Sequence, residues 1–315
     1  PNIPYICLNF LLMQRLVFWL VFPFLWVISK FPFWLFYKVS DLIFFIVYYL
    51  VGYRRKTVIE NLKLALPGKT DKEYKRISKR SFQHMCDMFL EMVKSISIPS
   101  DELKRRYTFT NISEIQRIRD LNKSIILICG HYASYEWINA LQLYGIDYRG
   151  YGIYKKVQNR YFDKMAKDIR ERFDGELITT SEATKTIKSN QQNGKLGVYA
   201  IVADQSPKLS RAKYWSKFLG TTVPIFLGSE KLAKNLDMAV MYLHVEKKGR
   251  GLYQASFIPI TDYAAEEPDF KITNKFLSEL EKQIKKKPEY YLWTHKRWKH
   301  KDAPIPKDAI VFPRN

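Results

Sequence analysis

Residues 16–53 are the feature that most constrains this chain, because they form a nearly uninterrupted run of aromatic and aliphatic side chains. Only three of them carry charge: Lys30, Lys38 and Asp41. A membrane-spanning helix needs about 20 mostly apolar residues, but Pro23 and Pro32 favour a kink or a break in any helix formed here. The run is also rich in Trp and Tyr, which settle at the level of lipid headgroups. It predicts a membrane anchor, either one kinked span or a shallow helical hairpin.

The sequence after the apolar run indicates how the anchor is oriented. Arg54, Arg55 and Lys56 follow directly, and basic flanks of this kind stay on the cytoplasmic side. A signal peptide is the competing interpretation, but no small-residue cleavage site follows the run. We therefore divide the chain into an N-terminal membrane anchor, residues 1–53, and a domain comprising residues 54–315.

Positive charge dominates the remainder. The 315 residues contain 52 Lys and Arg against 31 Asp and Glu, for a formal charge of +21, while 47% are hydrophobic, too many for a disordered polycation. Residues 54–80 and residues 271–301 each hold ten basic residues against three acidic ones. Beside an apolar anchor, each Lys or Arg near the surface adds about 1 kcal/mol of attraction to anionic lipid. We expect anionic membrane lipids as a partner and not nucleic acid, because no helix-turn-helix, zinc-finger or RNP signature is present.

Helical and strand patterns alternate in the second domain. Helical periodicity covers 57–66 and 72–98, and short apolar runs typical of strands then alternate with helical segments. The predicted strands are 124–129, 148–154, 176–180 and 196–203, and the predicted helices are 135–144, 158–173, 182–193 and 225–235. A hairpin is expected over 238–246 and 252–260, and a basic helix over 271–287. This order predicts an α/β fold with a largely parallel sheet flanked by helices, whose active groups follow the carboxyl ends of strands.

A histidine and a glutamate follow the first of these strands. His131 comes just after Cys129, and Glu136 is five residues further on. Five residues within one helix are about 140° out of phase, so the two side chains meet only if His131 lies in the turn and Glu136 in the first helical turn. A carboxylate that accepts the second N–H of an imidazole makes the imidazole a general base. The pattern predicts this role for His131, although a strand-end histidine is often only structural.

The segment Gly130–Trp137, GHYASYEW, resembles the H-x4-E motif of the lipid A biosynthesis acyltransferase family. Four further matches follow the family's order: Tyr53-Arg54 with Asn61-Leu62 and Pro67; Ala203-Asp204-Gln205; Phe218-Leu219-Gly220-Thr221; and PEYYLWTHKR at 288–297. The chain departs from the family at Ala133, Ser134 and Tyr135, where Gly, Asn and Trp are common. These departures leave the charged pair intact, and they bear on the identity of the acceptor or acyl chain.

The resemblance implies transfer of a fatty acyl chain from acyl carrier protein, or from coenzyme A, to a hydroxyl of a membrane glycolipid. It points to secondary acylation of a lipid A precursor at the cytoplasmic face of a bacterial inner membrane. His131 would be the base and Glu136 its orienting partner, and Arg170, preferred to Arg172, would stabilise the oxyanion. The expected substrate-binding residues are Arg172, Asp204, Gln205, Gly220 and Thr221, with Gly220 allowing a close backbone approach.

Other chemistries lack their signatures. No H-E-x-x-H motif and no paired Cys-x-x-Cys supports a zinc site, and no G-x-S-x-G elbow supports a serine hydrolase. We expect neither a metal nor an organic cofactor. Two alternatives stay open: acylation of another glycolipid or a lysophospholipid, and a non-catalytic membrane-bound scaffold in which His131 and Glu136 are structural.

Overall fold

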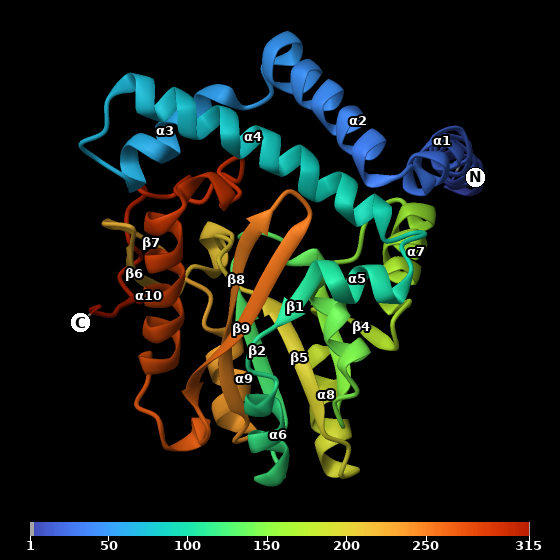
Figure 1. The fold of residues 1–315 in the computed structure, drawn as a ribbon. Helices are drawn as coiled ribbons and strands as arrows, with labels where there is room; N and C mark the ends of the chain where they lie inside the picture. The colour runs from blue at the N-terminus through green and yellow to red at the C-terminus, as the bar shows by residue number, and fades with distance from the viewer. Residues whose placement is uncertain (1–2, 315) are drawn as a thin grey trace.

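In the computed structural model of the chain, residues 3–314 are described, with side chains from residue 12 onward. A seven-stranded sheet occupies the centre, with helices on both of its faces and across one end (Figure 1). The helices are α1 (Ile3–Lys30), α2 (Phe33–Phe45), π-helix η1 (Ile46–Val51), α3 (Arg55–Ala65), α4 (Asp71–Lys94), α5 (Ser100–Arg106), α6 (Ser113–Asp120), 3₁₀-helix η2 (Glu136–Tyr144), α7 (Arg160–Glu171), α8 (Ala183–Gln192), η3 (Leu209–Arg211), α9 (Gly228–Asn235), η4 (Ala264–Glu266), α10 (Lys271–Lys286) and η5 (Pro288–Tyr290). The strands are β1 (Tyr107–Phe109), β2 (Ile125–Cys129), β3 (Arg149–Tyr154), β4 (Gly175–Thr179), β5 (Gly197–Val202), β6 (Tyr214–Phe218), β7 (Thr221–Pro224), β8 (Ala239–Gly249), β9 (Leu252–Thr261) and β10 (Ile310–Val311).

The large sheet has the order β1-β9-β8-β2-β5-β3-β4. Strands β8, β2, β5, β3 and β4 are mutually parallel, whereas β9 pairs antiparallel with β8 in the predicted hairpin. All five residues of β2 are buried, which explains its uninterrupted apolar sequence, since a parallel strand is covered on both faces. The predicted α/β fold with a largely parallel, helix-flanked sheet is confirmed.

The register of the central strands fixes where the functional residues can meet. Cys129, the last residue of β2, pairs with Val202, the last residue of β5. Because the two strands are parallel neighbours, the loops that follow them leave the sheet at the same edge and at the same level. Residues shortly after Cys129 and Val202 are therefore neighbours in space.

Helix α4 runs across this carboxyl edge, above the sheet in Figure 1. A capping box starts the helix: Thr70 accepts from the backbone N–H of Glu73, and Glu73 accepts from the N–H of Thr70, which satisfies two otherwise unpaired donors. Helix α4 is bonded to the segments at this edge, because Ser81 donates to the carbonyl of Tyr291 and Trp137 donates to that of Glu91. One helix thus links the N-terminal segment to the sheet edge.

The N-terminal segment forms two helices separated by a break at Phe31 and Pro32. By length and composition, the stretches Leu12–Lys30 and Phe33–Val51 are each long and apolar enough to cross a membrane. Helix α2 nevertheless buries one face, which consists of Phe36, Tyr37, Ser40 and Phe44. Helix α2 therefore packs against the rest of the chain, and the division at residue 53 stays a prediction.

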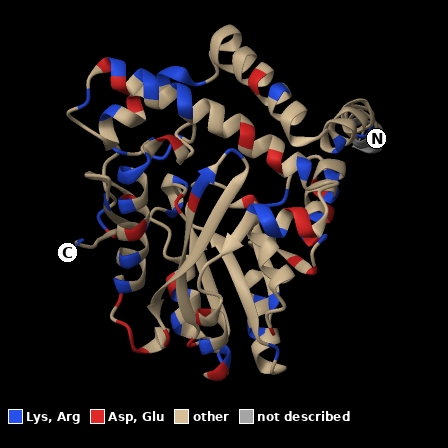
Figure 2. Ribbon diagram, in the orientation of Figure 1, with Lys and Arg blue, Asp and Glu red and all other residues tan. Residues whose placement is uncertain are grey.

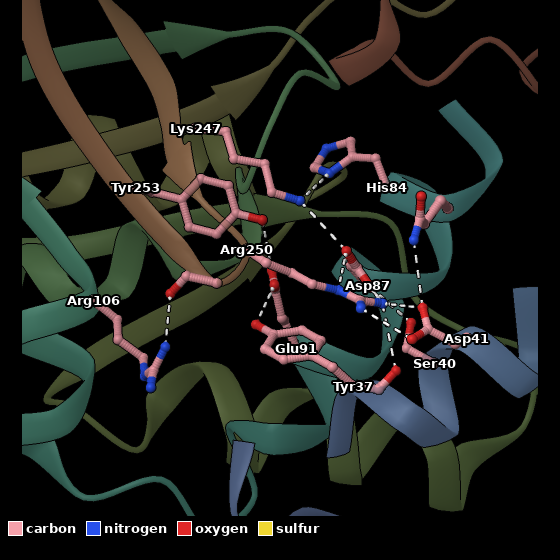
Figure 3. Close-up of polar contacts among 12 residues, drawn as sticks. Tyr37, Ser40, Asp41, His84, Asp87, Glu91, Arg106, Lys247, Arg250 and Tyr253 are labelled. Carbon is pink, nitrogen blue, oxygen red and sulfur yellow. Dashed lines mark hydrogen bonds and ion pairs between the residues drawn. The ribbon is translucent and has the colours of Figure 1, made fainter. Parts of the chain in front are cut away.

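A largely buried polar network attaches α2 to the rest of the protein (Figure 3). Arg250, at the turn between β8 and β9, donates to both carboxylate oxygens of Asp87, at 2.7–3.1 Å, and pairs with Asp41 of α2 at 2.6 Å. Glu91 is 1% exposed and accepts from the hydroxyls of Tyr37 and Tyr253 at 2.9 and 2.8 Å. Burial raises the pKa of Glu91, and the two phenol donors satisfy its oxygens.

A small second sheet, of order β10-β6-β7, was not predicted. Its strands are short, and the turn between β6 and β7 carries Leu219 and Gly220 with φ of 47° and 83°. Two successive residues with positive φ form the tight turn that suits a two-residue hairpin. This turn gives a local reason for glycine at position 220.

Candidate active site

His131 and Asp204 face each other at the carboxyl edge of the sheet. His131 follows β2 and Asp204 follows β5, and the imidazole Nδ1 lies 2.6 Å from Asp204 Oδ1. The same carboxylate oxygen accepts from the backbone N–H of His131 at 3.1 Å. The ring is thereby held at two points by one carboxylate.

The second ring nitrogen of His131 meets Gln205. Its Nε2 lies 3.1 Å from the Nε2 amide of Gln205, a group that only donates. The arrangement is consistent when Nδ1 carries the proton and donates it to Asp204, because Nε2 then keeps a lone pair that accepts from Gln205. A neutral imidazole with a lone pair on Nε2 is the form that removes a proton.

The electrostatics of the pair determine how basic the His131 ring is. Asp204 is 2% exposed, and burial alone would raise its pKa. The adjacent imidazole, with Tyr291 and the Arg297 guanidinium, instead lowers the pKa of Asp204 to about 2. For His131, burial opposes the cation, but the carboxylates of Asp204 and Glu136 outweigh it and raise the pKa. A buried, ionised carboxylate thus increases the basicity of the ring.

Glu136 forms an ion pair with Arg170 instead of binding the imidazole. It is the first residue of η2, and both of its oxygens accept from Nη2 of Arg170 at 2.8 and 2.9 Å, with Nε donating at 3.0 Å. The expected partner of His131 was Glu136; in the structure that place is taken by Asp204. His131 does lie in the turn after β2, and Glu136 does lie in the first turn of η2, as predicted. The Glu136 carboxylate, however, binds the guanidinium of Arg170 in the last turn of α7.

The signal that Asp204 is the partner lay in the strand order. Asp204 and Gln205 were expected in the site as substrate-binding residues, since both follow the same predicted strand, 196–203. Only the pairing of β2 with β5 brings Asp204 next to His131, and one sequence does not specify which strands are neighbours. Sequence analysis therefore named the residues of both pairs but assigned the carboxylates to the wrong partners.

The C-terminal motif at 288–297 lies against the His131 loop. The N–H of Leu292 donates to the carbonyl of His131 at 3.0 Å, and the N–H of Ala133 donates to that of Tyr290 at 2.9 Å. Ala133 has a φ of 49°, a left-handed conformation that glycine adopts more easily. These bonds fix the loop that carries His131.

Two residues of this motif extend the site beyond the predicted set. Tyr291 is 2% and Arg297 is 1% exposed, and both act on the charge of Asp204. Arg297 donates to the carbonyl of Pro224 at 3.2 Å and lies 5.0 Å from the ring centroid of Phe218. A buried guanidinium near a buried carboxylate is a feature that only the assembled fold reveals.

Arg54 and Asn61 hold the motif from the other side. Asn61 donates to the carbonyls of Trp293 and His295 at 2.9 and 3.0 Å, and Arg54 donates to that of Thr294 at 3.0 Å. These are the residues that resembled the segment after the anchor. In the structure, Arg54 and Asn61 support the C-terminal motif, and that motif in turn supports the loop that carries His131.

The other predicted substrate-binding residues lie outside this cluster. Arg172 donates to the carbonyl of Ser95 at 2.9 Å and stacks on Phe173. Gly220 and Thr221 lie in the β6–β7 hairpin of the second sheet. Contact of Arg172, Gly220 and Thr221 with substrate stays a prediction. Among the described residues, His, Cys, Asp and Glu side chains form no group of three that could hold a metal ion.

Comparison with known proteins identifies the family. Residues 7–300 match the family model for bacterial lipid A biosynthesis acyltransferases. The lipid A biosynthesis lauroyltransferase of Escherichia coli K12 is 23% identical over 294 residues, which cover 91% of this chain and 93% of the relative. Lipid A biosynthesis acyltransferase 2 of Shigella flexneri is 22% identical over 82% of this chain and 81% of its own, and the E. coli myristoyltransferase is 22% identical over 76% and 73%.

Of the motifs that lie far apart in the sequence, Ala203-Asp204-Gln205 and the C-terminal motif at 288–297 lie against the His131 loop, and Arg54 and Asn61 support the C-terminal motif. With a match that spans nearly the whole chain, this protein is an acyltransferase and belongs to the bacterial lipid A biosynthesis acyltransferase family.

Proposed function

We propose that this protein transfers a fatty acyl chain from acyl carrier protein to a hydroxyl of a lipid A precursor, a secondary acylation, at the cytoplasmic face of the inner membrane. The observation that carries the proposal is the buried His131–Asp204 pair at the carboxyl edge of the sheet. Relatives named as lauroyl- and myristoyltransferases of lipid A biosynthesis support the acceptor class and the fatty acyl donor.

His131 is the general base in this proposal. Nε2 removes the proton from the acceptor hydroxyl as the oxygen attacks the thioester carbonyl, and Asp204 stabilises the imidazolium that forms. The hydroxyl takes the place of the Gln205 amide at Nε2. When the tetrahedral intermediate collapses, the C–S bond breaks and the imidazolium returns the proton to the departing thiolate, so that the ester and a free thiol are formed.

Arg170 is the proposed partner of the oxyanion, and Glu136 acts through it as a positioning residue. Glu136 occupies Nε and Nη2 of Arg170, while Nη1 has no partner among the described residues. A guanidinium fixed by a bidentate carboxylate can direct its remaining N–H at charge that develops in the transition state. This assigns to Glu136 a role different from the one expected from the sequence.

The basic surface supports an acidic macromolecular donor and anionic lipid. Lysines and arginines crowd α3, the first half of α4 and the length of α10, on the side of the molecule where the C-terminal motif lies (Figure 2). Attraction of this kind raises the rate of encounter with an acidic partner. Acyl carrier protein fits it better than coenzyme A, which offers a smaller charged area.

A reconstituted reaction tests the proposal. The full chain in detergent micelles is incubated with acyl carrier protein or coenzyme A thioesters and with a lipid A precursor or a lysophospholipid, and products are identified by mass spectrometry. We expect an ester on the lipid A precursor, formed faster from the carrier protein. Acylation of the lysophospholipid alone would change the proposed acceptor from a lipid A precursor to a lysophospholipid. No product from any pair, with folding intact, would contradict both the proposed donors and the proposed acceptors.

A further inference from the structure

Helix α1 lies along the protein body over about 15 residues. Its inward positions are Gln14, Phe18, Phe22, Leu25 and Ser29, spaced four, four, three and four residues apart, as on one face of a helix. Gln14 and Ser29 are buried, and the three apolar residues between them are half-buried. Contact with the body therefore continues along the stretch that a membrane span would need to occupy.

Polar bonds hold both ends of this stretch. At one end, Gln14 accepts from the backbone N–H of Arg160 and donates to the carbonyl of Gln158, each at 3.3 Å. At the other end, the carbonyl of Ser29 accepts from Lys94 and Ser97 at 2.7 Å. The two ends are about 22 Å apart at 1.5 Å per residue, and their partners lie beside α7 and at the end of α4.

Helix α2 is held in the same way along its inner face (Figure 3). Ser40 donates to Asp87 of α4 at 2.8 Å, close to the Asp41–Arg250 pair, and Tyr48 of η1 packs on Phe82 of α4. A bilayer-spanning α2 would draw α4 into the hydrocarbon with it. That is costly, because charged groups in the membrane interior are strongly disfavoured and the first half of α4 exposes the side chains of Lys72, Lys75, Arg76, Lys79 and Arg80.

The outward faces of both helices are mostly apolar and exposed. Most of the large exposed hydrophobic side chains of the protein are gathered here: Leu12, Met13, Leu16, Val17, Trp19, Leu20, Val21, Phe24, Trp26, Val27, Trp34, Leu42, Phe45, Ile46, Tyr49, Leu50, Val51 and Tyr53. Basic residues border them, with Lys30 and Lys38 exposed within the segment and Arg54, Arg55 and Lys56 after it. Apolar side chains edged by positive charge fit the boundary between acyl chains and anionic headgroups.

We propose that residues 12–53 form a monotopic anchor, in which α1 and α2 lie in one leaflet with their outer faces toward lipid and do not cross the bilayer. Side chains on these faces enter the headgroup and acyl boundary by about 5–10 Å. Of the two anchors that the sequence left open, the contacts at both ends of α1 select the shallow hairpin. This inference does not depend on the proposed reaction.

The anchor also places the sheet edge close to the membrane. α2 packs on α4, and Ser81 of α4 bonds to the carbonyl of Tyr291, next to the loop that carries His131. A hydroxyl on a lipid in the same leaflet then reaches the site by lateral diffusion.

Depth measurements with single spin labels test the anchor. Leu16→Cys, Leu20→Cys and Val27→Cys place labels within about 40° of one another on the outer face of α1. Each is made in a Cys7→Ser background, in which the remaining cysteines, Cys86 and Cys129, are buried. The full chain is reconstituted in vesicles of phosphatidylethanolamine and phosphatidylglycerol, and depth is taken from the ratio of oxygen to nickel-chelate collisions.

We expect the three labels to lie at the same shallow depth, within a few ångströms. A transmembrane α1 would instead give depths that change by about 16 Å between positions 16 and 27, and that result would overturn the proposal. Labels shielded from both oxygen and nickel, with dipolar coupling between chains, would overturn it in favour of a dimer interface. Circular dichroism and an unchanged thermal transition confirm that each labelled chain is folded.

Discussion

The imidazole Nδ1 of His131 lies 2.6 Å from Oδ1 of Asp204, a residue 73 positions later in the chain. The carboxylate is almost fully buried, and the adjacent ring, together with Tyr291 and Arg297, lowers its pKa and keeps it ionised. Glu136, which is much nearer in sequence, is bound to Arg170 instead. The site is therefore built from two carboxylates with separate tasks.

The first prediction concerns the pH dependence of acyl transfer. His131 must be neutral to accept a proton, and its pKa is raised, so kcat/KM should rise with pH through a value above the usual imidazole range. Asp204→Asn removes the charge that raises this pKa, so the acid limb should move to lower pH. Turnover of Asp204→Asn should fall by about 10²–10⁴, because no carboxylate then keeps the proton on Nδ1 or stabilises the imidazolium that forms.

Glu136→Gln is the matched control for this profile. It removes the other carboxylate of the site but leaves the Nδ1 contact in place, so its acid limb should move less than that of Asp204→Asn. An acid limb that moves with Glu136→Gln and stays fixed with Asp204→Asn would restore Glu136 as the partner of the base.

The second prediction separates Arg170 from Arg172. Arg170→Ala should lower kcat by about 10²–10³ with little change in KM, because the charge it stabilises appears only in the transition state. Arg172→Ala should leave kcat within a few-fold, since this side chain binds the Ser95 carbonyl.

Steady-state kinetics of the double variant complete this test. Glu136→Gln should add little to the loss in an Arg170→Ala chain, because the glutamate acts through the arginine. Full additivity of the two losses in free energy, or a turnover defect confined to Arg172→Ala, would contradict the assignment.

The third prediction concerns the polar network below α2. Arg250→Met leaves Asp87 buried with one fewer partner and Asp41 without its cation, so unfolding should become easier by about 3 kcal/mol. Arg105→Ala removes an exposed pair with Glu102 and should cost less than 1 kcal/mol. Thermal unfolding in detergent, followed by circular dichroism, measures both, and equal stabilities would show that the network does not hold α2.

The fourth prediction concerns Asn61, which touches no reacting group. Asn61→Ala leaves the carbonyls of Trp293 and His295 without their donor, at about 1–3 kcal/mol for each buried group. Acyl transfer should decline along with thermal stability, because the motif that supports the His131 loop loosens. Asn193→Ala is the control: it removes an exposed hydrogen bond to the Ser189 carbonyl, so it should leave acyl transfer unchanged and lower stability far less.

Local patterns were sufficient to predict most of the central fold. The apolar runs at β2 and β5 and the helical periodicity of α4 and α10 were found close to their observed bounds. Several short elements were missed, among them β1, with three residues, and the strands of the second sheet, with two to five residues each. Such segments carry too few residues for periodicity to appear, and their pairing depends on partners far away in the chain.

The site could be predicted as a set of residues but not as a set of pairs. His131, Glu136, Arg170, Asp204 and Gln205 were all named from the sequence and do come together. Their pairing depends on the β2–β5 adjacency and on the approach of α7 to η2, which are properties of the tertiary structure. Buried groups such as Arg297 gain their significance only from that environment.

The single-turnover rate of acyl transfer by His131→Ala tests the central claim most directly. The full chain is mixed with acyl carrier protein thioester and a lipid A precursor, and ester formation is followed in parallel with circular dichroism of the variant. If His131 is the base, the rate should fall by about 10²–10⁴ while the chain stays folded. A folded variant that keeps more than about a tenth of the wild-type rate would contradict base catalysis by His131.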